Sequence, residues 1–160
     1  MTFVIEPLSS SHDRTEFACG VEALDRYFRQ QVGQDVRRRV TTCFVASETA
    51  TGRIAGFNTL AAAAVPLAEM PVSLSKRLPL CPSVPVARLG RLAVATAYHG
   101  RKLGAALLWD AVARASRSEL AVYALAVDAK DEQAEQFYRH HGFIAFPSNP
   151  RTLILPLKAR

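Results

Sequence analysis

The segment His99-Gly-Arg-Lys-Leu-Gly-Ala105 combines two glycines, two cations and the start of a helix. A helix start leaves backbone N–H groups unpaired and carries partial positive charge. Glycine lets the backbone approach a ligand closely, and Arg101 and Lys102 add positive charge. The pattern indicates a diphosphate-binding loop, and a strand–turn–helix connection that binds nothing remains the alternative. The helix is predicted from apolar residues at helical spacing after the loop: Leu103, Leu107, Leu108, Ala111, Val112 and Ala115.

Two well-known phosphate-binding loops do not match this segment. It lacks the Gly-Lys-Ser/Thr ending of a P-loop, and Gly100 and Gly104 do not have Gly-x-Gly-x-x-Gly spacing. Asp128 ends a later apolar run and is placed where a ribose-binding acid would stand. A dinucleotide-binding fold therefore stays open as a minor option.

The charge of the chain points to an anionic partner. The formal net charge is +6 over 160 residues, and the cations cluster. One interpretation is a solvated basic surface, and the other is a binding surface for a large anionic partner, most of all a nucleic acid. The clusters are Arg37-Arg38-Arg39, Lys76-Arg77, Arg88 with Arg91, and Arg101-Lys102.

The length and composition predict one globular domain over residues 1–160. No apolar run is long enough to span a membrane and the first residues do not resemble a signal peptide, so we expect a cytoplasmic protein without a membrane partner. Cys19, Cys43 and Cys81 form no Cys-x-x-Cys pair, and Cys43 is expected in the core. The adjacent His140 and His141 face different sides of a helix, so no metal is expected.

The remaining elements follow from periodicity and breaker residues. The fold class is mixed α/β, with a central mixed sheet flanked by helices. Helices are expected over 13–39, broken at Gly20 and near Gly33, after Lys102, and from Asp131 to Gly142. Residues 61–85 contain five prolines and are expected to be largely irregular. Strands are expected over 3–6, 41–47, 53–60, 86–95, 120–127, 143–146 and 152–157.

This order of elements resembles the GNAT superfamily of acetyl-coenzyme A-dependent N-acetyltransferases. The family's pyrophosphate loop, Arg/Gln-x-x-Gly-x-Gly/Ala, aligns with His99–Gly104, where His99 and Lys102 depart from the pattern and Gly104 matches it. A narrower resemblance, to the GNAT toxins of bacterial type II toxin–antitoxin systems, covers nearly the whole chain. It rests on Phe17-Ala-Cys-Gly-Val-Glu-Ala-Leu-Asp-Arg-Tyr-Phe28, Arg88-Leu-Gly-Arg-Leu-Ala-Val94 and Gln136-Phe-Tyr-Arg-His-His-Gly-Phe143.

The narrower resemblance implies an activity and partners. The toxin would move an acetyl group from acetyl-CoA to the α-amino group of aminoacyl-tRNA and so block translation. Its partners would be a ribbon-helix-helix antitoxin and a second copy of itself. Two alternatives remain open, a GNAT enzyme acting on a small amine or a protein N-terminus, and a non-catalytic module that binds antitoxin or DNA.

The resemblance also implies roles for individual residues. The backbone of Leu92, Ala93 and Val94 would hold the pantetheine arm, and the N–H of Leu92 or Val94 would polarise the thioester carbonyl. The diphosphate segment would comprise His99, Gly100, Arg101, Lys102, Leu103, Gly104 and Ala105. Tyr138 would be the general acid, with nearby arginines lowering its pKa. No protein base is expected, since an α-amino group has a pKa of about 7.7–8.0.

Five arginines are candidates for contacts with tRNA. Arg91, beside the cofactor strand, is expected to meet a phosphate or the acceptor end. Arg88 is a weaker candidate, and a structural salt bridge would explain either arginine. Arg37, Arg38 and Arg39 fit either the tRNA backbone or a charged helix end. Trp109 is expected to pack along its helix and not to stack on bases.

Overall fold

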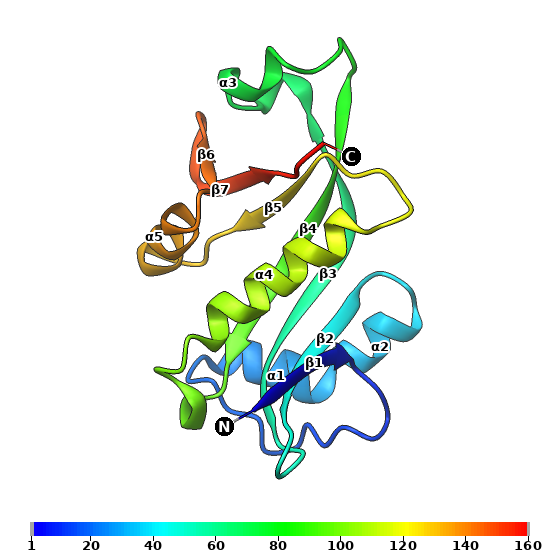
Figure 1. Ribbon diagram of the computed structural model, residues 1–160, viewed down its shortest axis with the longest axis vertical. Helices are drawn as coiled ribbons and strands as arrows, with labels where there is room; N and C mark the ends of the chain where they lie inside the picture. Colours follow the sequence, from blue (N-terminus) through cyan, green and yellow to red (C-terminus); the bar gives the residue numbers. More distant parts are fainter. Residues whose placement is uncertain (1, 160) are drawn as a thin grey trace. The chain divides into compact units, whose positions relative to one another are not determined.

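The computed structural model describes residues 2–159 (Figure 1). Its elements alternate between strands and helices in the order expected of a mixed α/β protein. They are β1 (Phe3–Pro7), α1 (Glu22–Gln30), α2 (Val32–Arg37), β2 (Thr42–Glu48), β3 (Ile54–Pro66), the 3-10 turn η1 (Leu67–Glu69), α3 (Val72–Ser75), β4 (Ser83–Val94), the 3-10 turn η2 (Thr96–Tyr98), α4 (Leu103–Ser116), β5 (Ala124–Asp128), α5 (Glu132–His140), β6 (Ile144–Phe146) and β7 (Asn149–Pro156).

The strands form one mixed sheet, as predicted. Its order is β1-β2-β3-β4-β5-β7-β6. Strands β4 and β5 are parallel, while β1 with β2, β2 with β3, β5 with β7 and β6 with β7 are antiparallel. No helix within residues 2–159 is long and apolar enough to cross a bilayer.

The chain divides into two compact units, which are described separately. The first contains Met1–Ala61 and Gly90–Ala111, and the second contains Ala62–Leu89 and Val112–Arg160. Strands β3 and β4 and helix α4 contribute residues to both units.

Three phenylalanines build the centre of the first unit. The rings of Phe28 and Phe57 are stacked with their centroids 4.2 Å apart, and Phe17 meets Phe28 edge-on at 4.8 Å. Cys43 is 3% exposed in the same cluster, so its predicted place in the core is confirmed. Burial raises the pKa of the Cys43 thiol to about 12, which keeps it protonated and unreactive.

Strand β3 approaches the end of β4 so closely that only glycine fits at one position. A Cβ added to Gly56 would lie 2.8 Å from both the Ala93 carbonyl oxygen and a Leu107 methyl group. Two residues further along β3, the Asn58 amide donates a hydrogen bond of 3.0 Å to the Leu107 carbonyl. Within the first unit, β3 therefore holds both the last residues of β4 and the first turns of α4.

The second unit is centred on the parallel pair β4 and β5. Their register aligns Val86 with Ala124 and Leu89 with Val127, and these residues are buried. Helix α5 begins at a well-formed cap, because the Asp131 carboxylate accepts the Ala134 N–H at 2.8 Å. Gly142, with a φ of +94°, ends the helix as predicted.

The expectation of helix from Asp13 onward is wrong up to Val21. The Asp13 carboxylate accepts both the N–H and the hydroxyl of Thr15, which forms a local turn that competes with helix, and α1 begins only at Glu22. The second break, predicted near Gly33, is confirmed and falls at Gln31, while Gly33 itself lies inside α2. Glycine without a positive φ is tolerated in a helix, so its presence alone did not locate the break.

The expectation that residues 61–85 are largely irregular is wrong at both ends, where β3 runs to Pro66 and β4 starts at Ser83. Proline removes a donor from a strand but keeps an acceptor. Here the Pro82 carbonyl accepts the Leu67 N–H at 3.2 Å, and the Pro85 carbonyl accepts the Tyr123 N–H at 2.8 Å.

Two predicted strand boundaries also move. Residues 120–123 precede β5, which starts at Ala124, and Leu120 is 76% exposed. The last strand starts at Asn149, earlier than the predicted residue 152, because Asn149 pairs with Phe146 across a tight hairpin.

Candidate functional site

The last residues of β4 belong to the first unit. Ala93 is 6% exposed and points into the core, while Leu92 and Val94 are half-buried. The Ala95 N–H is bonded to the Ala55 carbonyl at 2.8 Å, and the Thr96 N–H is bonded to the Ala18 carbonyl at 2.9 Å. The strand end is thus fixed from two sides before the chain enters the predicted diphosphate segment.

That segment contains two left-handed residues, Gly100 at φ +81° and Lys102 at φ +58°. A Cβ at Gly100 would meet nothing within 4 Å, so the space beside it is open. Lys102 holds a conformation that glycine adopts more readily, at the position where the resembling family has its middle glycine. Helix α4 begins at Leu103, as predicted, and by its geometry its first N–H groups lack partners within the helix.

His99 explains one departure from the family pattern. Its Nε2 donates to the Val94 carbonyl oxygen at 2.8 Å. The side chain therefore ties the predicted diphosphate segment to Val94, the last residue of β4 and of the predicted cofactor strand. The structure thereby brings residues 92–94 and 99–105 together within the first unit.

Tyr98, the residue before this segment, is held by a hydrogen bond to the end of β2. Its hydroxyl donates to a Glu48 carboxylate oxygen at 2.7 Å. Hydrogen bonds from Tyr98 and Thr51 lower the pKa of Glu48, and the bond to Glu48 raises the pKa of Tyr98. Both shifts keep the pair in its bonded form at neutral pH.

The donors of this segment fit an anionic diphosphate. The side chains of Arg101 and Lys102 are exposed, and the first turn of α4 supplies N–H groups beside them. Gly100 leaves space for a close approach. The arrangement offers positive charge and backbone donors without a carboxylate among residues 99–105.

Arg91 is placed by an aromatic ring. Its guanidinium carbon lies 3.5 Å from the centroid of Tyr27, on α1. The Tyr27 hydroxyl donates to an Asp35 carboxylate oxygen at 2.8 Å. Sequence reasoning assigned no role to Tyr27 or Asp35, and no local pattern links them to Arg91, because the contact joins distant parts of the chain.

The basic cluster that follows α2 is exposed. Arg37 is the last residue of α2, Arg38 is its C-cap, and Arg39 has a φ of +63°. All three side chains reach solvent. This placement fits a charged helix end and leaves the three cations accessible to a polyanion.

Tyr138 lies in the second unit, on α5. It is 8% exposed, and its ring contacts Phe137 edge-on at 5.3 Å and Phe143 at 5.4 Å. Burial raises the pKa of Tyr138 to about 12, so the expectation that arginines lower it is wrong. Within residues 2–159 its hydroxyl makes no hydrogen bond.

Arg88, also in the second unit, forms an ion pair with Asp128. The other Asp128 carboxylate oxygen accepts the Thr152 hydroxyl at 2.8 Å. Both oxygens of Asp128 therefore have a partner, which supports the structural alternative for Arg88. Trp109 of α4 is 45% exposed, so helix packing covers only part of its surface.

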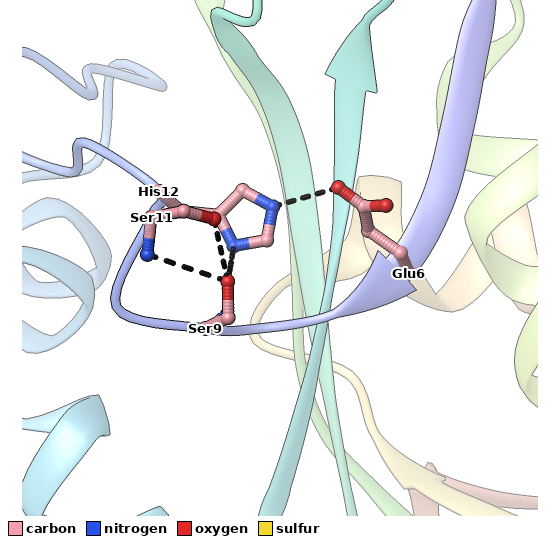
Figure 2. A network of polar contacts seen from close by, with 4 residues as sticks. All are labelled: Glu6, Ser9, Ser11 and His12. Atoms are coloured by element: carbon pink, nitrogen blue, oxygen red, sulfur yellow. Dashed lines mark hydrogen bonds and ion pairs between the residues drawn. The ribbon is translucent and has the colours of Figure 1, made fainter.

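A carboxylate near the end of β1 meets a serine and a histidine of the loop that follows it (Figure 2). His12 Nε2 donates to Glu6 at 2.8 Å, and the Ser9 N–H donates to His12 Nδ1 at 2.9 Å. The Ser9 hydroxyl is 3.3 Å from the same Nδ1 and 2.7 Å from the Ser11 hydroxyl. Since the backbone N–H already uses the Nδ1 lone pair, this cluster stabilises a turn and has no free base for a nucleophile.

One further feature, a cavity, was not predicted. A cavity of about 350 Å³ in the first unit is lined by the loop before α1, the β2–β3 hairpin and η2, and it includes none of the predicted cofactor residues. Within residues 2–159, no group of three His, Cys, Asp or Glu residues could hold a metal ion. His140 and His141 meet edge-on with centroids 5.1 Å apart, and burial and His140 lower the pKa of His141.

Comparison with protein-family models matches residues 6–143 to the acetyltransferase (GNAT) family. The chain belongs to this family, which replaces the dinucleotide-binding option. It is 34% identical over 153 residues to a tRNA-acetylating toxin of Mycobacterium tuberculosis (strain ATCC 25618 / H37Rv), covering 94% of this chain and 90% of the relative.

Solved structures agree with the family assignment. AtaT complexed with acetyl-methionyl-tRNAfMet superposes with a TM-score of 0.89 at 27% identity, covering 97% of this chain and 95% of AtaT. AtaTR bound with AcCoA gives 0.82 at 26% identity, with 96% and 93% covered. A tyrosine-to-phenylalanine variant of AtaT bound to the C-terminus of the antitoxin AtaR gives 0.80 at 25%, with 96% and 92% covered.

Proposed function

We propose that this protein is a toxin that transfers the acetyl group of acetyl-CoA to the α-amino group of an aminoacyl-tRNA and so blocks translation. The observation that carries the proposal is the similarity along nearly the whole chain to a tRNA-acetylating toxin. The structure of AtaT with acetyl-methionyl-tRNAfMet supports the same substrate class. The open, positively charged segment 99–105 supports acetyl-CoA as the acetyl donor.

In this proposal the coenzyme lies on the first unit. The backbone of Leu92, Ala93 and Val94 holds the pantetheine arm, and the N–H of Leu92 or Val94 polarises the thioester carbonyl. Residues 99–105 hold the diphosphate through Arg101, Lys102 and the N–H groups at the start of α4. His99 keeps the segment next to the strand by its bond to the Val94 carbonyl.

The reaction needs no protein base. The neutral α-amine attacks the acetyl carbon, the C–N bond forms, the C–S bond breaks, and the nitrogen loses a proton while the thiolate gains one. An α-amino group has a pKa of about 7.7–8.0, so a large fraction is already neutral near pH 7. The proton that the nitrogen loses therefore equals the proton that the sulfur gains, and no other group has to keep it.

Tyr138 donates to the departing sulfur. Its pKa of about 12 keeps the hydroxyl protonated at neutral pH. Complete transfer to a thiolate, whose acid has a pKa of about 8.5, is uphill for such a group. We therefore infer that Tyr138 donates a hydrogen bond as the C–S bond breaks, and that the proton from the nitrogen follows.

The tRNA contacts are assigned to Arg91 and to the exposed cluster Arg37, Arg38 and Arg39, whereas Arg88 is held by Asp128. The proposal treats residues 1–160 as a single acetyltransferase domain. The protein acts in the cytoplasm, where charged tRNA is found, with a ribbon-helix-helix antitoxin and a second copy of itself as partners. The complex of AtaT with the C-terminus of AtaR supports an antitoxin as a partner.

The proposal is tested by incubating the protein with labelled acetyl-CoA and three acceptors: total charged tRNA, small amines and peptides with free N-termini. Label is expected on the aminoacyl group of charged tRNA and absent from deacylated tRNA. Label on a small amine or peptide alone would overturn the toxin assignment in favour of another GNAT activity. Binding of acetyl-CoA without transfer to any acceptor would favour a non-catalytic module.

A further inference from the structure

Arg91 is oriented by a buried aromatic ring in the first unit. The guanidinium carbon lies 3.5 Å from the Tyr27 ring centroid, close enough for direct stacking. Tyr27 is 7% exposed on α1, so the ring itself is held by the core. A flexible side chain is thereby confined to one plane.

The hydroxyl of the Tyr27 ring is hydrogen-bonded to a carboxylate. The Tyr27 hydroxyl donates to Asp35 on α2 at 2.8 Å, and the burial of Tyr27 and this hydrogen bond raise the pKa of Tyr27 to about 12. The phenol therefore remains a donor throughout the physiological range. A negatively charged acceptor increases electron density in the ring and so strengthens its attraction for the cation on its face.

The donor edges of Arg91 remain available. Across the described residues 2–159 its guanidinium forms no hydrogen bond or ion pair, although the ring covers one face. A planar guanidinium with a fixed face and open N–H edges binds phosphate through two parallel hydrogen bonds. Arg91 is half-buried and directly precedes Leu92, the first residue of the proposed pantetheine strand.

We propose that Tyr27 and Asp35 are positioning residues that hold Arg91 ready to bind a phosphodiester of the nucleic-acid substrate beside the cofactor strand. The inference rests on the proposed function, because it gives Arg91 a phosphate of tRNA as its ligand. The formal charge of +6 favours a polyanion over an isolated carboxylate as the occupant. Asp35 does not compete for Arg91, because Asp35 accepts from Tyr27.

The test combines kinetics and binding in Y27L, Y27F, D35A, R91A and the double variant Y27L/R91A. Y27L removes the ring face and is expected to raise KM for charged tRNA about 10-fold, with kcat and KM for acetyl-CoA unchanged. Y27F keeps the face and is expected to restore most of this loss, leaving a change of about 2-fold, as does D35A. R91A and the double variant are expected to coincide, because without Arg91 the ring has nothing to orient.

Direct binding separates this inference from the proposed function. The salt dependence of binding to deacylated tRNA is expected to lose about one unit of slope in both Y27L and R91A. This measurement needs no acetyl transfer, so it still decides the inference if the wild-type protein fails to acetylate charged tRNA. R88A is the matched control, and its slope is expected to equal that of the wild type.

Three results would overturn the inference. One is a Y27L protein with normal KM and normal salt slope while R91A is impaired. Another is an equal rise in the KM for acetyl-CoA and in the KM for charged tRNA in Y27L, which would indicate a general structural role for Tyr27. If Y27L does not fold, then Y27F and D35A decide, and wild-type KM for charged tRNA in both would contradict the role of Asp35 and of the polarised ring.

Discussion

Two regions of the molecule differ in how many of their hydrogen-bond donors already have partners. One is Arg91 to Ala105 in the first unit, and the other surrounds Arg88 and Tyr138 in the second. In the first region, the guanidinium of Arg91, the exposed Arg101 and Lys102 and the first N–H groups of α4 keep donors available. In the second, Arg88 is paired with Asp128, and Tyr138 is the buried group whose hydroxyl makes no hydrogen bond among residues 2–159. Donors left open in a fixed geometry indicate ligand binding, whereas closed pairs indicate structure.

The two arginines of Arg88-Leu-Gly-Arg91 show the same contrast at the level of one side chain. A carboxylate accepts a hydrogen bond from Nη1 of Arg88, while an aromatic ring covers only one face of Arg91. The type of neighbour therefore distinguishes the two arginines, and we infer that Arg91 is the one that binds substrate.

The largest effect is expected at the open hydroxyl of the second region. Y138F is expected to lower kcat by about 100-fold, because the departing thiolate loses its donor. KM for acetyl-CoA is expected to stay the same, since in our proposal the coenzyme is held by the first unit. Steady-state kinetics with charged tRNA measure both, and unchanged turnover in a folded Y138F protein would remove Tyr138 from the reaction.

The next effect concerns the open arginine of the first region. R91A is expected to raise KM for charged tRNA by about 10-fold or more, because a charge-assisted bidentate contact is lost. R91K is expected to recover only part of this, since an ammonium cannot make the same fork or stack in the same way. Full recovery with lysine would show that charge alone matters at this position.

A smaller effect is expected at the tie between the cofactor strand and the diphosphate segment. H99A removes the bond to the Val94 carbonyl and is expected to weaken acetyl-CoA binding by about 5-fold, roughly the contribution of one hydrogen bond. Calorimetric titration with acetyl-CoA measures the change, and H99Q, which restores a side-chain donor, is the control. Affinity equal to the wild type in H99A would mean that the segment is positioned by other contacts.

The closed pair of the second region is expected to matter least for activity. R88A is expected to change KM for charged tRNA by less than about 2-fold, and the loss of a partly exposed pair is expected to cost at most about 1 kcal/mol of stability. Thermal unfolding and kinetics on the same sample measure both quantities. A loss of tRNA affinity as large as that of R91A would erase the distinction between the two arginines.

The pH dependence of kcat should show no contribution from Tyr138. A general acid is active while protonated, and burial raises the pKa of Tyr138 to about 12, so its activity is retained as pH rises to roughly 10. A fall in kcat with an apparent pKa near 10 in the wild type, absent from Y138F, would contradict this burial.

Local patterns were enough to predict part of the fold and of the site. The helix from Leu103 follows from apolar spacing, and the cap and end of α5 follow from Asp131 and Gly142. Contacts between distant segments were beyond such patterns. The Asp13 carboxylate accepts the Thr15 N–H, and a turn forms there in place of the predicted helix. The stacking of Arg91 on Tyr27 depends on how α1 packs.

The predicted segment 92–105 is brought together in one unit, but its special geometry was not in the motif. His99 reaches back to Val94, and Lys102 takes a left-handed conformation without being glycine. Both follow from the folded backbone and not from residue type. The direction of the pKa shift of Tyr138 also differs from the prediction, because burial raises its pKa and no arginine lowers it.

Hydrogen–deuterium exchange of the protein with and without acetyl-CoA tests most directly whether residues 92–105 hold the coenzyme. Slower exchange is predicted at the backbone amides of Leu92 to Val94 and of Gly100 to Ala105, with smaller changes in the loop before α1. Protection confined to the cavity formed by that loop, the β2–β3 hairpin and η2, or no protection at all at saturating acetyl-CoA, would contradict the account.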